Sequence, residues 1–360
     1  MSWILGFTGT SLSPTLRERL VALHGAARFK TRSETLYLAV GGLAETCCYA
    51  GLHQTSFDGF AVVGLGIRLH ERHCTFLDTE DWRALITRPR PALDALDGHF
   101  VAVRWQPGKV ACFTDALGIR TLYLTRLSGG VAFSTRLDWL AALRNDAEIN
   151  FETFGTHWLT FNQLSTDSLV SGIQRMGPGS RATCTDGDFQ LINHPWTPDT
   201  GESDRRGEAF SKILAALVHP KTADGRTLSL GLSGGLDSRL LLALRPSDAP
   251  IQTHVFGPDE HPDVRVSKRI AEGEGLQHVH FHAPTPEADE CLDLLRNHVA
   301  QTHAVSSASS LLGLRYYPDL HAQHRLMIDG GFGEAARRQF MNRLLRQGRS
   351  ALRTGHPAAI

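Results

Sequence analysis

Apolar and polar residues alternate over short stretches through the first half of the chain. Runs of strand length, rich in β-branched and aromatic residues, predict strands at residues 3–7, 35–40, 60–69, 99–106, 109–114, 122–127 and 131–135. Helical periodicity is strongest at residues 14–24 and 137–145. This pattern predicts a sheet-rich α+β domain over residues 1–200.

The pattern changes after a polar stretch at residues 199–206. A helical segment at 207–218 precedes strand-like runs at 227–232, 251–256, 278–282 and 325–328, with helical segments at 263–274, 286–300 and 306–321. Regular alternation of strands and helices predicts an α/β domain with a parallel sheet, here over residues 205–360. Ligands in such sheets bind at the carboxyl ends of the strands.

One of these carboxyl ends carries the segment Ser233-Gly234-Gly235-Leu236-Asp237-Ser238, which is followed by a leucine-rich helix start. Two adjacent glycines allow a tight turn, and the helix N-terminus then offers backbone N–H groups to an anion such as phosphate. The serine hydroxyls add donors, and Asp237 suits a Mg²⁺ ligand among phosphate oxygens. A tight turn with capping serines is the alternative. The segment differs from the Walker pattern G-x-x-x-x-G-K-[ST], which the chain lacks.

The segment resembles the Ser-Gly-Gly-x-Asp-Ser motif of the PP-loop ATP pyrophosphatases, which cleave ATP between the α- and β-phosphates. Residues 96–102, 113–123, 133–140 and 172–179 resemble, in the same order, four strings of the asparagine synthetase family. That family joins an Ntn-type class II glutamine amidotransferase domain to a synthetase domain. The resemblance implies an α+β Ntn-hydrolase-like domain followed by an α/β PP-loop domain (Rossmann-like, adenine nucleotide α-hydrolase-like), with ATP and Mg²⁺ as cofactors.

The first domain departs from the family's glutaminase pattern. Glutaminase members begin Met-Cys-Gly-Ile, where the cysteine is the nucleophile, but this chain begins Met1-Ser2-Trp3-Ile4. A hydroxyl is ionised far less than a thiol, so Ser2 is a catalytic candidate only if glutaminase activity is retained. The family's glutamine-binding Asn-Gly-Glu is replaced by Val63-Gly64-Leu65-Gly66. We therefore expect a degenerate amidotransferase-like domain.

A second glycine-rich segment, residues 328–334, resembles the family's S-G-x-G-x-D-E loop. By this resemblance Gly330 matches the first glycine and Glu334 matches the metal-binding aspartate, so Asp237 and Glu334 would hold Mg²⁺ and act in catalysis. A glycine-rich turn with Glu334 at a helix N-terminus is the alternative. The resemblance also implies an adenosine pocket lined by Leu232, Phe256 and Gly257.

These features predict acyl activation. A carboxylate of a small molecule or peptide would attack the α-phosphorus of ATP, and ammonia or a substrate amine would then displace AMP to form an amide. Use of a substrate amine is the strategy of the related β-lactam synthetases and lasso-peptide cyclases. The chain is short after the second segment, and its last lysine is Lys268, so the family's later phosphate-contacting lysine has no counterpart. An inactive or accessory nucleotide-binding homologue is therefore the alternative.

Composition limits the partners. The 37 basic and 37 acidic residues balance, so charge does not favour nucleic acid or an anionic membrane. The N-terminus lacks a basic region and a cleavage site, no apolar run reaches membrane-spanning length, and the six cysteines form no C-x-x-C pair. A cytoplasmic protein is expected, and a partner protein, a precursor peptide or a homodimer stays open.

Three histidines, His278, His280 and His282, alternate along one predicted strand and so share a face. A shared face could hold a metal ion, but we favour a place beside the nucleotide cleft. Tyr316 and Tyr317 are interpreted as packing residues of a helix.

Overall fold

The computed structural model describes residues 2–51, 58–88, 91, 93, 96–160, 165–194, 206–222, 225–246, 250–282, 284, 286–302 and 308–331. The chain divides into two compact units, one of Met1–Arg68 and Phe76–Gly201 and the other of Leu69–Thr75 and Glu202–Ile360. The predicted first domain was continuous, whereas residues 69–75 group with the second unit. There, Cys74 and Thr75 pair in parallel with Pro220 and Lys221.

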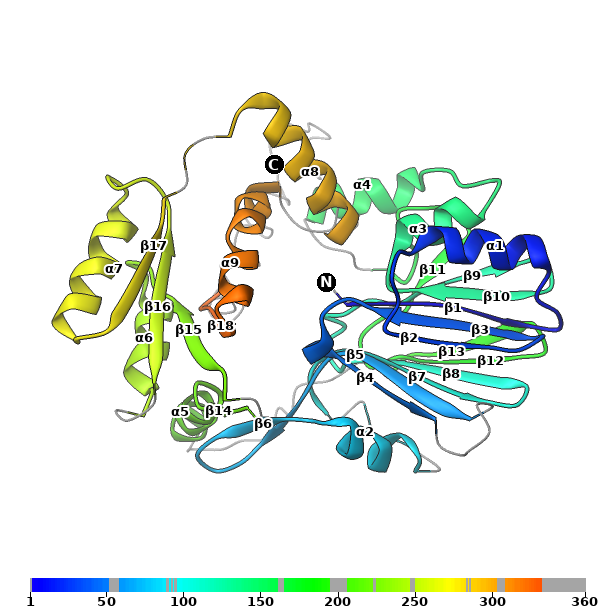
Figure 1. The fold of residues 1–360 in the computed structure, drawn as a ribbon, viewed down its shortest axis with the longest axis horizontal. Helices are drawn as coiled ribbons and strands as arrows, with labels where there is room; N and C mark the ends of the chain where they lie inside the picture. The colour runs from blue at the N-terminus through cyan, green and yellow to red at the C-terminus, as the bar shows by residue number, and fades with distance from the viewer. Residues whose placement is uncertain are drawn as a thin grey trace, which may run out of the picture. The chain divides into compact units, whose positions relative to one another are not determined.

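The first unit contains an antiparallel sheet with the strand order β11-β9-β10-β1-β3-β2. These strands are β1 (Trp3–Gly9), β2 (Phe29–Arg32), β3 (Leu36–Gly41), β9 (Tyr123–Leu127), β10 (Gly130–Ser134) and β11 (Ile173–Arg175). The helices α1 (Pro14–Leu23) and α3 (Leu137–Leu143) cover its outer face, where Leu20 and Leu140 join the core formed by Leu5 and Phe7 (Figure 1).

A second antiparallel sheet lies against the inner face of the first. Its order is β13-β12-β8-β7-β5, with β4 also paired to β5. The strands are β4 (Cys47–Gly51), β5 (Gly59–Leu69), β7 (Asp97–Gln106), β8 (Lys109–Thr114), β12 (Arg181–Thr185) and β13 (Asp188–Ile192). Ile4 and Phe133 of the first sheet share one buried core with Val63 and Val103 of the second.

The helix α2 (Thr79–Ile86) covers the outer face of the second sheet, with Trp82 and Ile86 packed against Phe60 and Phe100. The layers are therefore helix, sheet, sheet and helix, and the α+β prediction for this region of the chain is confirmed. A 3₁₀ helix η1 (Ala44–Thr46) and the helix α4 (Phe151–Thr160) complete the unit.

The second unit is built on a parallel sheet with the order β17-β16-β15-β18, as the alternating pattern predicts. The strands are β15 (Thr227–Gly231), β16 (Ile251–Phe256), β17 (Gln277–Phe281) and β18 (Arg325–Ile328). The helices are α5 (Arg206–Leu217), α6 (Leu236–Leu244), α7 (Pro262–Gly273), α8 (Ala288–Thr302) and α9 (Tyr317–Ala322), with the 3₁₀ helix η3 (Ala308–Arg315). Short strands β6 (Cys74–Phe76) and β14 (Pro220–Lys221) form the pair described above.

Helices cover both faces of this sheet (Figure 1). Leu242 of α6 and Ile270 of α7 pack against Leu230 on one face. Leu320 of α9 and the preceding Tyr316 pack against Phe281 on the other. Among the helices that the structure describes, none combines the length and the apolar character needed to cross a lipid bilayer.

The strand order reverses between β15 and β18. From β15 the chain proceeds outward to β16 and β17, and then returns to the opposite side of β15 as β18. In open α/β sheets, a reversal of this kind leaves a crevice at the carboxyl ends of the two strands, where ligands bind. The loops that start at Leu232 and at Asp329 lie at this point.

Candidate functional site

The loop between β15 and α6 is held by its own serines. Ser238 is buried in the first turn of α6, and its hydroxyl accepts the Ser233 N–H at 3.1 Å and donates to the Ser233 carbonyl at 3.3 Å. The Gly235 N–H donates to Ser233 Oγ at 3.1 Å, and Gly235 is the N-cap of α6. These bonds of the two serines fix the conformation of the turn, and α6 begins directly after it.

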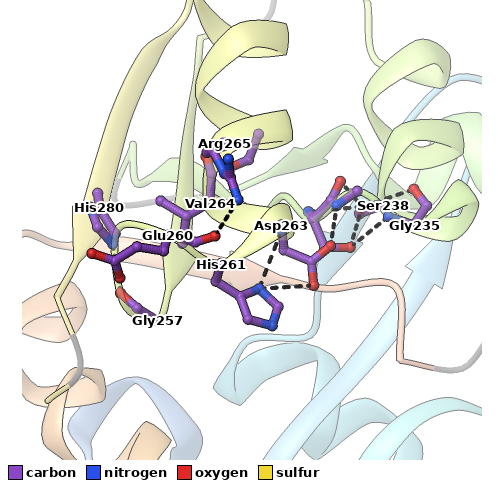
Figure 2. Close-up of polar contacts among 12 residues, drawn as sticks. Gly235, Ser238, Gly257, Glu260, His261, Asp263, Val264, Arg265 and His280 are labelled. Atoms are coloured by element: carbon purple, nitrogen blue, oxygen red, sulfur yellow. Dashed lines mark hydrogen bonds and ion pairs between the residues drawn. The ribbon is translucent and has the colours of Figure 1, made fainter.

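A carboxylate from the next helix also holds this loop. Asp263 Oδ1 accepts the backbone N–H of Gly234 at 2.7 Å. Asp263 lies in the first turn of α7, after the N-cap His261 and Pro262, and its own N–H donates to His261 Nδ1 at 3.2 Å (Figure 2). Sequence analysis predicted a helix beginning at residue 263 but did not select Asp263 as a site residue, because its contact with Gly234 depends on how α7 packs beside the loop.

The loop after β18 contacts the loop after β15 through a glycine. A Cβ on Gly330 would lie 2.9 Å from Asp237 Cβ, which is closer than real Cβ atoms approach, and 3.0 Å from the Ser238 backbone nitrogen, which is at that limit. Asp329 Oδ1 accepts the Gly331 N–H at 2.9 Å. The absence of a side chain at Gly330 is therefore what allows the two loops to meet.

The two loops border a cleft of about 440 Å³. Its lining includes the predicted site residues Leu232, Ser233, Gly235, Asp237, Ser238, Phe256 and Gly330. It also includes His254, Asp263, Tyr317 and Asp329, which sequence analysis did not select. Gly234 and Leu236 belong to the same loop, and Gly257 follows Phe256. Glu334 lies outside the described residues.

The predicted adenosine wall is an aromatic and backbone surface. The Phe256 ring stacks on Phe281 with centroids 5.4 Å apart and also contacts Tyr316. Gly257 has φ of +135°, which strains any residue with a side chain. Its N–H donates to the Phe281 carbonyl at 3.1 Å, and its carbonyl accepts His280 Nε2–H at 2.7 Å.

The cleft has an acidic and a neutral side. Asp237, Asp263 and Asp329 line it among the described residues, so a bound phosphate chain requires a cation between the charges. Mg²⁺ prefers carboxylate oxygens together with substrate phosphates, and these side chains fit it. His254 is 1% exposed and bonds to the Ser229 hydroxyl through Nδ1 at 2.9 Å. Burial lowers the pKa of His254 to about 4, so its ring is neutral at pH 7.

Ser2 lies in the first unit, immediately before β1, and is 2% exposed. Its hydroxyl donates to the Leu43 carbonyl at 3.3 Å and bonds to the Thr46 hydroxyl, and its carbonyl accepts Arg120 Nη2–H at 2.9 Å. A carbonyl and a hydroxyl are not bases at neutral pH, so these partners do not activate Ser2 as a nucleophile. Burial also raises the pKa of the neighbouring Cys47 thiol.

The sequence matches no family model and no curated protein. Among solved structures, the chain is similar to glutamine phosphoribosylpyrophosphate amidotransferase from B. subtilis complexed with ADP and GMP, with a TM-score of 0.35 and 10% identity over 81% of this chain and 70% of that chain. It is also similar to the "allosteric regulatory enzyme of purine biosynthesis", with a TM-score of 0.34 and 10% identity over 78% of this chain and 80% of that chain.

A third similar structure is glutamine-dependent NAD⁺ synthetase from Acinetobacter baumannii in complex with ADP. The TM-score is 0.26, with 13% identity over 52% of this chain and 43% of that chain. Similarities at these TM-scores do not identify a function for the chain. The geometry of the two loops and of the cleft between them is the ground for a proposal.

Proposed function

We propose that the chain is an ATP- and Mg²⁺-dependent amide ligase of the asparagine synthetase type, which activates a carboxylate as an acyl-adenylate. One observation carries this proposal: the glycine-rich loop at 233–238 meets the loop at 329–331 at the reversal point of a parallel sheet. A helix N-terminus at such a point is suited to phosphate, and carboxylates beside it are suited to a cation.

Each region of the cleft has a distinct task in this reaction. The first turn of α6 binds the phosphates, and Asp237 holds Mg²⁺, with Glu334 as the second ligand by resemblance. Phe256 gives the adenosine an apolar surface, and Gly257 adjoins Phe256 in the pocket that the resemblance implies. Bound Mg²⁺ supplies positive charge to the departing pyrophosphate. Gly330 keeps the two loops close enough for both sets of groups to reach one nucleotide.

The nitrogen source of the proposed ligase is inferred from Ser2 in the first unit. Ser2 has a hydroxyl where the resembling glutaminases have a thiol, and a hydroxyl is ionised far less, so the ligase takes ammonia or an amine of the substrate. The buried hydroxyl is also engaged by the Leu43 carbonyl and the Thr46 hydroxyl. The carboxylate belongs to a small molecule or to a peptide.

The test is release of AMP and pyrophosphate from ATP and Mg²⁺ with ammonium and a panel of carboxylates, starting with aspartate. The Asp237→Asn variant should lose at least about 100-fold in rate, because a metal ligand is removed. Asp293→Asn, on the exposed surface of α8, is the matched control and should keep the wild-type rate. Equal rates in wild type and Asp237→Asn would overturn the proposal.

A second candidate function is a nucleotide-binding accessory protein that forms no adenylate. The observation that favours it is the Asp263 carboxylate on the Gly234 N–H, since that donor is already held by an anion of the protein itself. ATP binding does not separate the two functions. ATP binding without AMP release under every condition would favour the accessory function.

A further inference from the structure

His280 in β17 and His282, which directly follows that strand, lie close to Asp259 in the loop between β16 and α7. Asp259, His280 and His282 each offer one ligand atom, and these atoms all lie within 4.8 Å of one another. Asp259 Oδ1 is 3.4 Å from His280 Nδ1, and Asp259 Oδ2 is 3.5 Å from His282 Nδ1. The carboxylate therefore faces the same nitrogen atom of both rings.

The tautomer of His280 is fixed by its other nitrogen. His280 Nε2 lies 2.7 Å from the Gly257 carbonyl oxygen (Figure 2), and a carbonyl only accepts, so Nε2 carries the proton. In the neutral ring the lone pair is then on Nδ1, the atom that faces Asp259. A histidine that ligates a metal ion typically donates its other N–H to a backbone carbonyl in this way.

The spacing of the three side chains fits an ion better than direct hydrogen bonds. N–H···O bonds have their donor and acceptor about 2.7–3.2 Å apart, shorter than both separations here. Zinc binds nitrogen and oxygen at about 2.0–2.2 Å in a tetrahedron, which places neighbouring ligand atoms about 3.3–3.5 Å apart. Each imidazole nitrogen lies at about this distance from one carboxylate oxygen: His280 Nδ1 is 3.4 Å from Asp259 Oδ1 and His282 Nδ1 is 3.5 Å from Asp259 Oδ2. Rotation of the exposed carboxylate presents one of these oxygens to an ion held between the two rings.

We propose that Asp259, His280 and His282 bind a divalent transition-metal ion of the zinc type, with a further coordination position open to solvent or a ligand. Two imidazole nitrogens select such an ion over Mg²⁺ and Ca²⁺, which prefer oxygen ligands. The site is separate from the carboxylates of the nucleotide cleft and does not depend on the proposed function.

The third histidine of the strand is not a member of this site. His278 Nδ1 lies 2.8 Å from the Thr253 hydroxyl, and His278 Nε2 lies 3.5 Å from the Ser267 hydroxyl. The alternation of residues along a strand places all three histidines on one face, but the side chain of His278 is engaged by β16 and α7. The third member of the proposed site is instead Asp259, from the loop between β16 and α7.

The ion would connect the end of β17 to the loop that begins at Gly257 and leads to Asp263. That loop supplies one wall of the predicted adenosine pocket at its start and the partner of the Gly234 N–H at its end. The proposed site is therefore placed to fix the segment on which the nucleotide cleft depends. Asp259 and His282 are 73% and 58% exposed at their side chains, so an ion reaches them from solvent.

The experiment is a titration of the metal-free, untagged full chain with Co²⁺ and Zn²⁺. Co²⁺ should give the visible absorption of a tetrahedral site, and Zn²⁺ should displace it at one equivalent. Asp259→Asn and His282→Gln should each weaken binding at least about tenfold. Both positions are exposed, and the circular dichroism of each variant checks its fold.

The control is His73→Gln, because His73 belongs to another group of histidines in this unit, with its ring stacked on His70 at 4.4 Å between centroids. Wild-type affinity in that variant supports the site at Asp259. Unchanged affinity in Asp259→Asn and His282→Gln, an equal loss in His73→Gln, or no binding by the wild type would each overturn the proposal.

Discussion

The Gly234 backbone N–H donates to the Asp263 carboxylate across 2.7 Å. Gly234 lies in the loop after β15, and Asp263 lies in the first turn of α7, so this bond ties the glycine-rich loop to the helix that leads from β16 to β17. A charge-assisted bond of this kind orders the loop. It also places a negative charge where a phosphate chain would lie.

Replacing Asp263 separates these two effects. Asp263→Asn keeps an oxygen acceptor for Gly234 but removes the charge, so we expect ATP without Mg²⁺ to bind several-fold more tightly, equivalent to about 1 kcal/mol of repulsion. Asp263→Ala removes the acceptor and should lower the free energy of unfolding by about 1–2 kcal/mol. Calorimetric titration with ATP in a chelator and urea unfolding measure the two effects.

The matched control is Asp289→Asn, since Asp289 is also an acid in the first turn of a helix, α8, but does not line the cleft. It should leave ATP binding unchanged. Weaker metal-free binding in Asp263→Asn would show that the carboxylate assists the nucleotide and does not repel it.

A methyl group at Gly330 should separate the two loops. Its nearest neighbours would be Asp237 Cβ at 2.9 Å and the Ser238 nitrogen at 3.0 Å, and the latter is a backbone atom that cannot rotate away. We expect Gly330→Ala to weaken ATP binding at least about tenfold and to cost about 1–3 kcal/mol of stability. Gly331→Ala is the control, because its Cβ would approach only the flexible Asp329 carboxylate, at 3.0 Å. Equal ATP affinities of the two variants would contradict this explanation.

The sequence pattern predicted several strands of the structure with their exact bounds. The bounds of β8, β16 and β18 agree with the predicted segments, since each is a short run containing β-branched or large apolar residues next to a glycine or proline turn. Sequence analysis missed α2, although Asp78 and Asp81 form a capping box there, because the helix is only eight residues long and shows only about two turns of periodicity. Where one helix was predicted at 306–321, the structure has η3 followed by α9, and residues 303–307 lie outside the described residues.

Without the family resemblance, sequence analysis could predict only those residues of the candidate site that are neighbours in the sequence. The glycines and serines of the loop are adjacent in sequence, so their pattern indicates phosphate directly. Asp263, His254 and Tyr317 reach the cleft because β15 lies between β16 and β18, and this order is a property of the whole sheet. The same reasoning applies to Asp259, which joins His280 and His282 through the position of a loop and not through periodicity.

Glutamine should not serve as a nitrogen donor. The Ser2 hydroxyl is ionised far less than a thiol, and it is buried and bonded to the Leu43 carbonyl and the Thr46 hydroxyl. We expect the wild type and Ser2→Ala to form glutamate from glutamine at the same background rate, while ammonium supports AMP release equally in both. If the wild type forms glutamate from glutamine and Ser2→Ala does not, the first unit is an active glutaminase and this prediction is wrong.

The buried His254 should make the stability of the second unit depend on pH. Burial lowers its pKa in the folded state to about 4, from an ordinary value of 6.5. Above pH 6.5 the His254 ring is neutral in both the folded and the unfolded protein. Between pH 6.5 and about 4 the ring takes up a proton only in the unfolded protein. Stability is therefore complete above pH 6.5 and declines as the pH falls to about 4, by roughly 3 kcal/mol for a difference of about 2.5 pKa units.

The measurement is urea unfolding of the wild type and of His254→Gln between pH 7 and pH 4. Glutamine keeps a partner for the Ser229 hydroxyl and does not titrate, so its free energy of unfolding should fall less over this interval. Carboxylates titrate in both proteins, and the difference between the two curves therefore isolates His254. Parallel curves for wild type and His254→Gln would mean that the folded unit accommodates the imidazolium, and that the neutral side of the cleft is not maintained by burial.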